Sequence, residues 1–487
     1  MSDKIFDIGI IGYGPVGATL SGLLSSLGLS VVVIEKNKGV SPTARAINTD
    51  SEQLRAFNFL NIAPKIIANS RKVKKVHFTD SEFNPYSTID IPKEDNLGWP
   101  PALLFYQPEL ETIIRDNNLK YKNLKILENT KAVNIENTKP IRVDIRNDKK
   151  DSKIYCEYLI GCDGANSFVR KYIDAKLIDF GFDQDWIVID AHTTKQIDIS
   201  KDEAKQICDP NRLKTYVPGR RNHKRFEFKL LRGETKKNFT KKKVWELLSP
   251  WINRNNSKIE RAVVYKFHAC IADKWRDKNI FIAGDAAHQM PPFLGAGMGT
   301  GIRDIFNLAW KVYLVIKGEA SEKLLETYQL EREPHANWTI QQAKLIGEMM
   351  EQFSYREKGE KYVPSNTGYG EVFPHLINGY YGDPTDGLIA TPFCRFNLDG
   401  SKKDSDEYFG WNFGLISKKK LPKEINLILK NMNIKVLLIN SHKLKNYFKD
   451  ANYLLIRPDK YLFSRSKTYS ELKKALSELE KQFSLIT

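Results

Sequence analysis

The sequence predicts an α/β protein with a β-rich insert and a small mixed α/β terminal domain. Residues 5–34 read as strand, glycine turn, helix and strand, which is a βαβ unit. Two later apolar runs, YCEYLIGCDG and NIFIAGDAAH, also end on acidic residues. Between them, over about residues 181–270, apolar and polar residues alternate, as in RFEFKLL. This alternation is typical of strands with one buried face.

The N-terminal unit explains why residues 8–34 carry no charge, a pattern that also occurs in membrane spans. Six glycines and Pro15 interrupt the stretch, which favours the buried βαβ unit. Asp7 stands where a secretion signal would have its apolar centre. The five cysteines form no Cys-x-x-Cys or zinc-ligand pattern. We therefore expect a cytoplasmic protein with no membrane span, no secretion signal and no metal site.

The overall composition limits which classes of protein remain possible. A chain of 487 residues predicts about two to four domains, and a hydrophobic content of 41% supports sizeable cores. The net charge of +17 leaves three interpretations open: a nucleic-acid surface, lysine-rich solvated faces, or a positive field that attracts anionic substrates. The lysines are scattered and no DNA-binding motif occurs, so we expect no nucleic-acid partner.

The turn of the first βαβ unit has the spacing Gly12-x-Gly14-x-x-Gly17, and Glu35 ends the next strand. The first glycine permits the tight turn, the second lets a pyrophosphate approach, and the third lets helix and strand pack. The helix N-terminus offers free N–H groups to an anion, and Glu35 can accept ribose hydroxyls. The motif predicts a Rossmann-like dinucleotide site; the alternative is a glycine turn without a ligand.

Two further motifs follow the later acidic strand ends. Asp163, in GCDGANSFVRK, precedes a helix that carries Arg170, so it is either a ligand contact or a helix cap. Asp285 is followed by QMPPFLGAGMG and a helix that starts near Gly299. So many small residues predict a planar, phosphorylated ligand pressed against the backbone; crowded strand–helix packing is the alternative.

Taken in order, GYGPVG with Glu35, CDGANSFVR and GDAAHQMPPFLGAGMG resemble the FAD-dependent aromatic hydroxylases, the class A flavoprotein monooxygenases with the p-hydroxybenzoate hydroxylase fold. The resemblance covers about residues 5–345. ARAINTDSEQLRAF, FYQPELETIIR and ETYQLEREPHA are similar to the 3-(3-hydroxyphenyl)propionate hydroxylase branch. ANYLLIRPDKYLFSR resembles the end of its thioredoxin-like C-terminal domain.

This resemblance implies three domains. They are an FAD-binding domain over 1–75, 105–180 and 275–360, a substrate-binding β-sheet domain over 76–104 and 181–274, and a thioredoxin-like domain over 380–487. It also implies the FAD contacts, which are Gly12, Gly14, Gly17, Glu35, Arg45, Gln107, Asp163, Asp285, Pro292, Gly295, Ala296, Gly297 and Met298. Ala296 departs from the family, which usually has Gly-Gln-Gly-Met at this turn.

The resemblance further implies the reaction. NADH or NADPH would reduce FAD, and O2 would form a flavin C4a-hydroperoxide that hydroxylates a phenol, with the new hydroxyl ortho to the existing one. Arg225, near the flavin ring in relatives, and His268 are the catalytic candidates, and Tyr216, Glu227 and Tyr265 are the substrate candidates. Arg225 suggests a phenol that carries a carboxylate.

Three questions stay open at this point. The enzyme could instead tailor or inactivate a polycyclic polyketide or antibiotic, because relatives do both. A non-enzymatic basic binding protein is the alternative of another class, and it predicts a colourless protein. A homodimer is also compatible with the resemblance.

Overall fold

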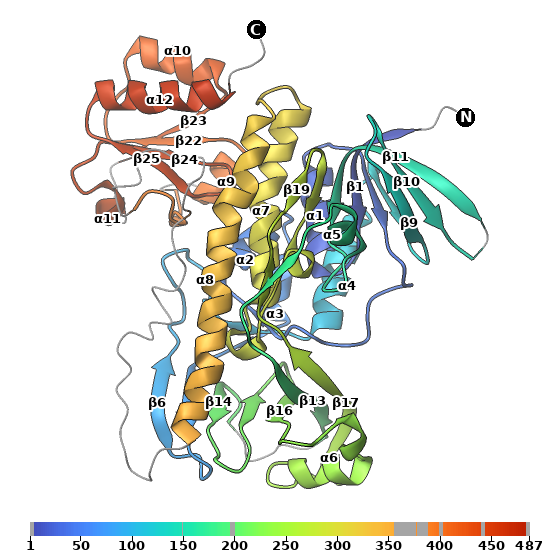
Figure 1. Cartoon of the computed structure of the whole chain (residues 1–487). Coiled ribbons are helices and arrows are strands. Elements are labelled where there is room, and N and C mark those ends of the chain that lie inside the picture. The colour runs from blue at the N-terminus through green and yellow to red at the C-terminus, as the bar shows by residue number, and fades with distance from the viewer. Residues whose placement is uncertain are drawn as a thin grey trace.

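The computed structural model describes residues 4–148, 150–194, 200–354, 376, 388–398, 403–439 and 444–483. Its first layer is an eight-stranded sheet in the order β19-β20-β11-β1-β2-β8, with β10 and β9 added beside β11 (Figure 1). The strands are β1 (Ile5–Ile11), β2 (Val31–Ile34), β8 (Leu124–Leu127), β9 (Lys131–Glu136), β10 (Ile141–Arg146), β11 (Asp151–Gly161), β19 (Arg276–Asp277) and β20 (Ile280–Ile282).

Strands β8, β2, β1, β11 and β20 run parallel, as the βαβ pattern predicts. Their carboxyl ends therefore meet at one edge, the usual ligand edge of such sheets. Glu35 and Asp163 follow the strand ends of β2 and β11 closely, and Asp285 lies three residues after β20. The helices of this part are α1 (Pro15–Ser26), α2 (Ser51–Asn58), α3 (Ala63–Ala68), α4 (Gln107–Asn118), α5 (Phe168–Tyr172) and α7 (Gly297–Ile316).

The second layer is a seven-stranded sheet in the order β17-β13-β16-β15-β14-β5-β6. It draws strands from both predicted insert segments, and β14 pairs with β5 in parallel. Its strands are β5 (Lys75–Thr79), β6 (Pro85–Asp90), β13 (Gln184–Thr193), β14 (Glu203–Ile207), β15 (Lys214–Val217), β16 (His223–Lys229) and β17 (Ser257–Phe267). One face packs an apolar cluster that includes Val244 and Leu248 of α6 (Lys241–Leu248).

Two three-stranded sheets join these layers. The first has the order β3-β7-β4, and the second has the order β12-β18-β21. Their strands are β3 (Asn48–Thr49), β4 (Arg71–Lys72), β7 (Leu103–Leu104), β12 (Leu177–Asp179), β18 (Cys270–Ala272) and β21 (His288–Gln289).

The C-terminal part contains a four-stranded sheet in the order β23-β22-β24-β25, in which only β22 and β23 are parallel. Its elements are α9 (Ser405–Phe409), β22 (Gly414–Ser417), α10 (Lys423–Asn431), β23 (Lys435–Leu438), α11 (Lys445–Phe448), β24 (Tyr453–Ile456), β25 (Leu462–Ser466) and α12 (Tyr469–Phe483). Residues 380–387 of the predicted terminal domain lie outside the described residues. Its likeness to thioredoxin stays a prediction.

The long helix α8 (Lys323–Ser354) connects all three parts (Figure 1). Glu331 binds Arg457 of the C-terminal part, and Glu351, near the other end of α8, accepts from Gln184 of the seven-stranded sheet. The mixed α/β fold with an inserted sheet is therefore confirmed. The exact domain boundaries stay a prediction.

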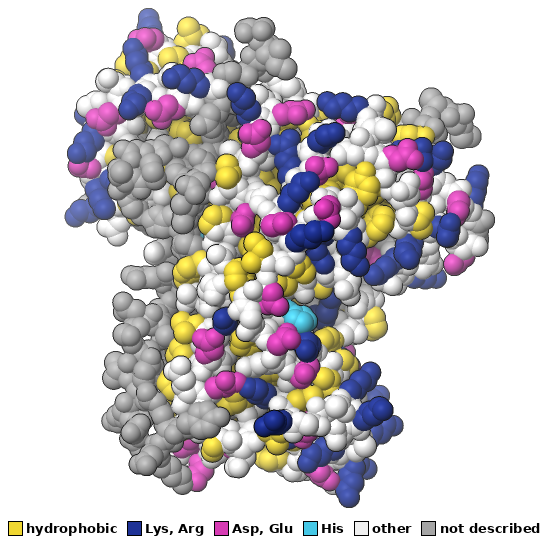
Figure 2. All heavy atoms as spheres, viewed as in Figure 1, with side chains coloured by type: hydrophobic (Ala, Val, Ile, Leu, Met, Phe, Trp, Pro, Cys, Tyr) yellow, Lys and Arg dark blue, Asp and Glu magenta, His cyan; other side chains and the backbone are white. Residues whose placement is uncertain are grey.

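The charged residues are mixed on the face shown in Figure 2, where Lys and Arg side chains lie among Asp and Glu side chains. None of the helices in the described ranges is long and apolar enough to cross a membrane. Nor do the described His, Cys, Asp and Glu side chains form a group that could hold a metal ion.

Candidate active site

The glycine turn between β1 and α1 is tightly packed on one side and open on the other. Gly12 has φ +102°, and a Cβ there would lie 2.3 Å from the carbonyl oxygen of Cys162. A Cβ on Gly17 would lie 2.1 Å from the carbonyl oxygen of Gly12. A Cβ on Gly14 would meet nothing within 4 Å, and Gly14 leaves the N-terminus of α1 without a side-chain cap. The turn thus presents free backbone N–H groups to open space, as an anion site requires.

The acids at the first two strand ends have different surroundings. Glu35 accepts hydrogen bonds of 2.8 Å from the backbone N–H groups of Tyr13 and Asn37, which fixes its carboxylate beside the turn. Asp163 accepts from the Ser167 hydroxyl and from the backbone N–H of Phe168 at 2.6 Å, so it caps the start of α5. Burial raises the pKa of Asp163, and these hydrogen bonds oppose that rise. The capping contacts expected for Asp163 are thus present beside the N-cap residue Ser167, and Asp163 also lines a cavity, so its role as a cofactor contact stays a prediction.

The third motif combines dense packing with an exposed edge. A Cβ on Gly301 would lie 2.9 Å from the Cα of Gly284, so α7 must approach the strand end closely. Pro292 begins a short 3-10 helix, η3 (Pro292–Leu294), and Gly295, with φ +63°, ends it. Ala296 is buried at the N-cap of α7. Pro292, Gly295, Gly297 and Met298 line a cavity together with Asp285. The Asp285 carboxylate makes no hydrogen bond or ion pair with any group in the described ranges.

Two cavities at this edge share lining residues, and together they are called the trough here. The glycine-turn cavity is lined by Gly12, Glu35, Arg115 and Asp163, among others. The sheet cavity, of about 310 Å³, runs from Val16 and Asp285 to the seven-stranded sheet. Both cavities are lined by Gly14, Arg45, Cys162 and Gly164. The trough therefore joins the glycine turn to the inserted sheet.

Alternation along the strands decides which side chains form the floor of the sheet cavity. Arg225 and Glu227 on β16 both line it, as expected for residues two apart on one strand face. On β15, Thr215 and Val217 line the cavity, and Tyr216 between them points to the opposite face. Tyr216 packs there against Phe226, with ring centroids 5.4 Å apart. The prediction that Tyr216 contacts substrate is thus wrong for this cavity.

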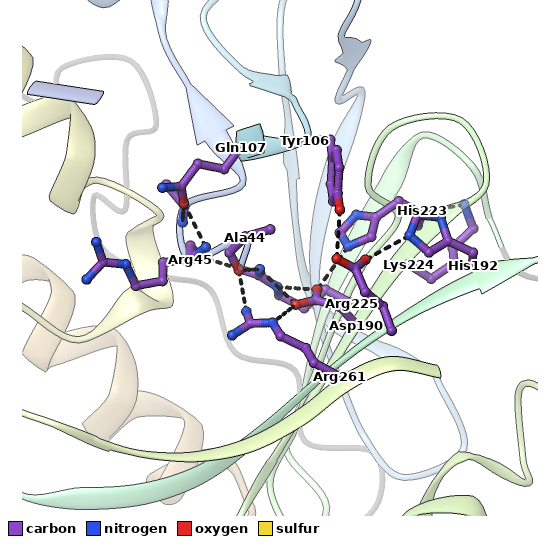
Figure 3. A network of polar contacts seen from close by, with 12 residues as sticks. Ala44, Arg45, Tyr106, Gln107, Asp190, His192, His223, Lys224, Arg225 and Arg261 are labelled. Atoms are coloured by element: carbon purple, nitrogen blue, oxygen red, sulfur yellow. Dashed lines mark hydrogen bonds and ion pairs between the residues drawn. The ribbon is translucent and has the colours of Figure 1, made fainter. Parts of the chain in front are cut away.

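Arg225 is held in a polar network rather than pointing freely into the cavity (Figure 3). Its Nε donates to Asp190 at 2.9 Å, and its two terminal nitrogens donate to the carbonyl oxygens of Arg45 and Ala44. Arg261 on β17 binds the same Asp190 and the same Ala44 carbonyl. Burial would raise the pKa of Asp190, but Arg225 and the other partners outweigh it and hold the pKa well below its usual range. The network fastens the 44–45 segment of the trough to the inserted sheet.

Gln107 secures the same segment from the other side. Its side-chain carbonyl accepts from the backbone N–H groups of Arg45 and Ala46, both at 2.7 Å, and its amide donates to Glu111 at 2.8 Å. Gln107 and Arg45 both line the sheet cavity, so the two residues predicted to contact the cofactor are brought together there.

The remaining candidates lie outside the sheet cavity. His268 has a side chain 44% exposed, and its Nδ1 lies 2.9 Å from a carboxylate oxygen of Asp183. Tyr265 accepts a hydrogen bond from Arg261 at 2.6 Å and is not among the lining residues. The structure therefore does not place His268 or Tyr265 for contact with a ligand in this cavity, which corrects their assignment.

Sequence reasoning missed three residues of this region. Gln206 on β14 and Thr215 on β15 line the cavity, and Asp190 organises the arginines beside it. Each lies in an alternating strand pattern, so its face could be guessed. The pairing of β14 with β15, of β15 with β16 and of β16 with β13, which brings the three into one sheet, is not encoded locally.

A family model described as an FAD binding domain matches residues 6–343. The chain belongs to this family. A protein from Rhodococcus jostii, named "Probable NADH-specific resorcinol 4-hydroxylase", is 33% identical over 349 residues, which are 71% of this chain and 65% of the relative. A Paraburkholderia xenovorans protein named 3-(3-hydroxy-phenyl)propionate/3-hydroxycinnamic acid hydroxylase is 31% identical over 350 residues, 70% of this chain and 55% of the relative. The chain thus spans less than two thirds of the length of these relatives.

Solved structures show the same fold over nearly the whole chain. The aklavinone-11 hydroxylase complex with FAD and aklavinone has a TM-score of 0.82 at 18% identity, covering 98% of this chain and 99% of that one. The flavin-dependent monooxygenase PieE, in complex with FAD and substrate, has a TM-score of 0.82 at 16% identity and covers both chains completely. The fold shared with these structures therefore extends over the C-terminal part described above.

Proposed function

We propose that this FAD-binding protein is a monooxygenase that uses NADH and O2 to hydroxylate a phenol next to an existing hydroxyl. The observation that carries the proposal is the pair of adjoining cavities that share four lining residues, one at a dinucleotide-type glycine turn and the other a mostly apolar chamber on the inserted sheet. The two relatives reported above are named as hydroxylases of phenols, and one is named as NADH-specific. These names support the reaction class and the choice of NADH.

The residues along the trough fit an extended FAD. We propose that Glu35 binds the adenosine ribose and that the open N-terminus of α1 at Gly14 faces the pyrophosphate. The unpaired Asp285 would accept from the ribityl hydroxyls, and Gly297 and Met298 at the start of α7 would face the ring system. Arg45 and Gln107 would contact the region between these ends. Asp163 supports this site as a cap on α5.

When bound and reduced, FAD would supply the activation of O2. The protein positions the substrate, excludes water from it and provides the charged groups around it. Ile47, Val73, Val76, Ala102, Leu104 and Val217 form apolar walls that exclude water from the ring of a bound phenol. Arg225 acts on the reaction through the 44–45 segment, whose carbonyl oxygens it holds. Phe293 of η3 packs edge-on against Trp186 of the sheet, with ring centroids 5.3 Å apart. This contact stabilises the turn that would face the flavin ring.

The size of the chamber favours a small substrate over a polycyclic one. About 310 Å³ is at the low end of ligand pockets, and part of this volume would hold the flavin ring. A polycyclic scaffold remains the second candidate, since the fold neighbours include hydroxylases of such compounds.

The test is to measure the colour and substrate response of the purified protein. We expect a flavin absorbance spectrum after FAD addition, and NADH oxidation that resorcinol stimulates with formation of a hydroxylated product. Asp285→Ala should weaken FAD retention, whereas Asp277→Ala on β19 of the same sheet should not. A protein that stays colourless at saturating FAD would contradict the proposal, and so would NADH oxidation that yields only peroxide with every phenol tested. Strong salt-dependent binding of nucleic acid by such a colourless protein would favour the non-enzymatic alternative.

A further inference from the structure

We propose that Glu227 is the specificity-determining residue of this site: it accepts a hydrogen bond from the hydroxyl of a neutral phenol and excludes phenols that carry a carboxylate. The inference rests on the proposed function and narrows its substrate class. It also replaces our sequence-based expectation of an acidic side chain on the substrate.

Glu227 belongs to a polar row that crosses the floor of the sheet cavity. Gln206 of β14 lies opposite Thr215 of β15, and Thr215 lies opposite Glu227 of β16. Opposed residues of paired strands have Cβ atoms about 5 Å apart and point to the same face. All three side chains line the cavity, whereas the chamber walls around them are largely apolar. The row is therefore the polar feature that a ring in this chamber meets on the sheet.

Within this row the hydrogen-bonding capacity is only partly used. The Thr215 hydroxyl donates to the Gln206 side-chain carbonyl at 2.6 Å, which turns the amide nitrogen of Gln206 away from that contact. Glu227 is 5% exposed, and its carboxylate makes no hydrogen bond or ion pair with any group in the described ranges. A nearly buried carboxylate without a partner is costly for the protein alone, so a ligand that donates to it gains a charge-assisted hydrogen bond.

The cations near Glu227 already bind other groups or lie on the cofactor side. Arg225, two residues away on the same strand face, is bound to Asp190 and to two backbone carbonyls. Arg261 is bound to Asp190, Ala44 and Tyr265. Arg45 lines the junction with the glycine-turn cavity, on the cofactor side. Among the described lining residues on the sheet side, every cation thus already binds another group. A substrate carboxylate would find no cation to pair with there, and Glu227 would repel that carboxylate.

The chemistry therefore favours a substrate that donates to Glu227 and brings no negative charge. A phenolic O–H satisfies the carboxylate, and the Gln206 amide nitrogen can donate to a second oxygen of the ring substituents. A like charge placed in the same chamber would cost binding free energy. A small neutral phenol with more than one hydroxyl fits all of these demands.

The experiment compares two phenols of nearly equal size and different charge. FAD-loaded protein without NADH is titrated at pH 8 with 3-(3-hydroxyphenyl)propan-1-ol and with 3-(3-hydroxyphenyl)propionate, and the flavin absorbance change reports binding. We expect the wild-type protein to bind the neutral alcohol about tenfold or more tightly than the acid. In Glu227→Gln this ratio should fall to about threefold or less, chiefly because the acid binds better.

The matched control is Glu203→Gln, which removes the same charge from β14 of the same sheet. Glu203 lies beside His77, outside the cavity lining, so this variant should keep the wild-type ratio. If the wild-type protein binds the acid as well as the alcohol, or if Glu227→Gln keeps the wild-type ratio, the inference is wrong. Stimulated NADH oxidation by either phenol would then still support the proposed function. If neither phenol binds and neither stimulates NADH oxidation, the proposed function fails and the inference fails with it.

Discussion

Glu331 and Glu227 are both acidic residues withdrawn from solvent, one between α8 and the C-terminal part and the other on the floor of the sheet cavity. Glu331 accepts hydrogen bonds of 2.9 Å and 2.8 Å from Arg457 and forms an ion pair of 2.8 Å with Lys311. Burial would raise its pKa, but Arg457 and Lys311 outweigh burial and hold the pKa low. Burial raises the pKa of Glu227 to about 7, because Arg225 offsets it only in part.

The surroundings of Glu331 and Glu227 distinguish a buried charge that stabilises the fold from one that is available to a ligand. The interface around Glu331 continues through Trp310, whose indole N–H donates to Asp459, and through Arg55, which binds Asp406 at 2.8 Å. Partners there come from different parts of the chain and bind one another, so the cluster holds the C-terminal part on the FAD-binding core. In the cavity, the carboxylates of Glu227 and Asp285 have no hydrogen-bond partner among the described residues, so a bound ligand can donate to them. Removing charge should therefore damage stability at the first site and ligand binding at the second.

The largest effect should follow from breaking the paired cluster. Arg457→Met removes the cation that binds both carboxylate oxygens of the buried Glu331, which should lower the free energy of unfolding by about 3–5 kcal/mol. Chemical denaturation of the FAD-loaded protein measures this loss. Lys473→Met, which breaks the exposed pair with Glu424, is the control and should cost less than about 1 kcal/mol. Equal losses in the two variants would mean that the cluster does not stabilise the interface.

A smaller effect, confined to the ligand, is expected at Asp285. Asp285→Asn removes an unpaired charge, so the free energy of unfolding of the FAD-free protein should change by less than about 0.5 kcal/mol. FAD affinity should fall by about 1–3 kcal/mol if the carboxylate accepts from ribityl hydroxyls. Flavin fluorescence titration gives the affinity. A large stability loss with unchanged FAD affinity would place Asp285 with the structural charges.

These sites also show how far the sequence alone could lead. The glycine turn and the acids at the strand ends are local patterns, so the FAD-binding fold and most of its trough could be predicted. The pairing of Arg225 with Asp190, 35 residues away, depends on which strands lie side by side. Arg225 was therefore predicted to face a substrate carboxylate, and Tyr216 was placed on the wrong face. Glu331 and Arg457, 126 residues apart, carry no sequence signal of their contact.

The pH dependence of stability should distinguish the two carboxylates further. A folded pKa of about 7 for Glu227, against an ordinary value of 4.5, means that the folded state binds more protons between these values. Stability contributed by this group is therefore present below about pH 4.5 and is lost as the pH rises towards 7. Glu227→Gln should be more stable than wild type by about 1–3 kcal/mol at pH 8 and should lose this advantage near pH 4.5.

The measurement is denaturation of the FAD-free protein at several pH values, with Glu246→Gln, which removes an exposed carboxylate paired with Lys243 on α6, as the control. The charged groups around Glu227 are Arg225 on its own strand, Asp190 on β13 and Arg261 on β17, with Arg45 and Asp285 lining the same cavity. Arg225 stays charged and Asp190 stays ionised over this range, because the pKa of Arg225 is raised and that of Asp190 is held well below its usual range. A pH-dependent difference between the wild type and Glu227→Gln therefore belongs to Glu227. A Glu227→Gln advantage that does not change with pH would show that the carboxylate finds a partner in solution.

The smallest effect is expected at Cys394, which tests whether the C-terminal part takes any part in the redox chemistry. Cys394 is the one cysteine beyond residue 300 in the sequence, and a disulfide couple needs two thiols. Its side chain is buried, and burial raises the pKa of the thiol to about 12, so the reactive thiolate is scarce at neutral pH. Cys394→Ser should therefore leave NADH-dependent turnover within about twofold of wild type, while the buried hydroxyl costs about 1 kcal/mol of stability. The assay compares product formed per NADH consumed in the two proteins after near-ultraviolet circular dichroism has shown intact folding. A large loss of turnover in a folded variant would mean that the C-terminal part does more than hold α7 and α8 in place beside the flavin site.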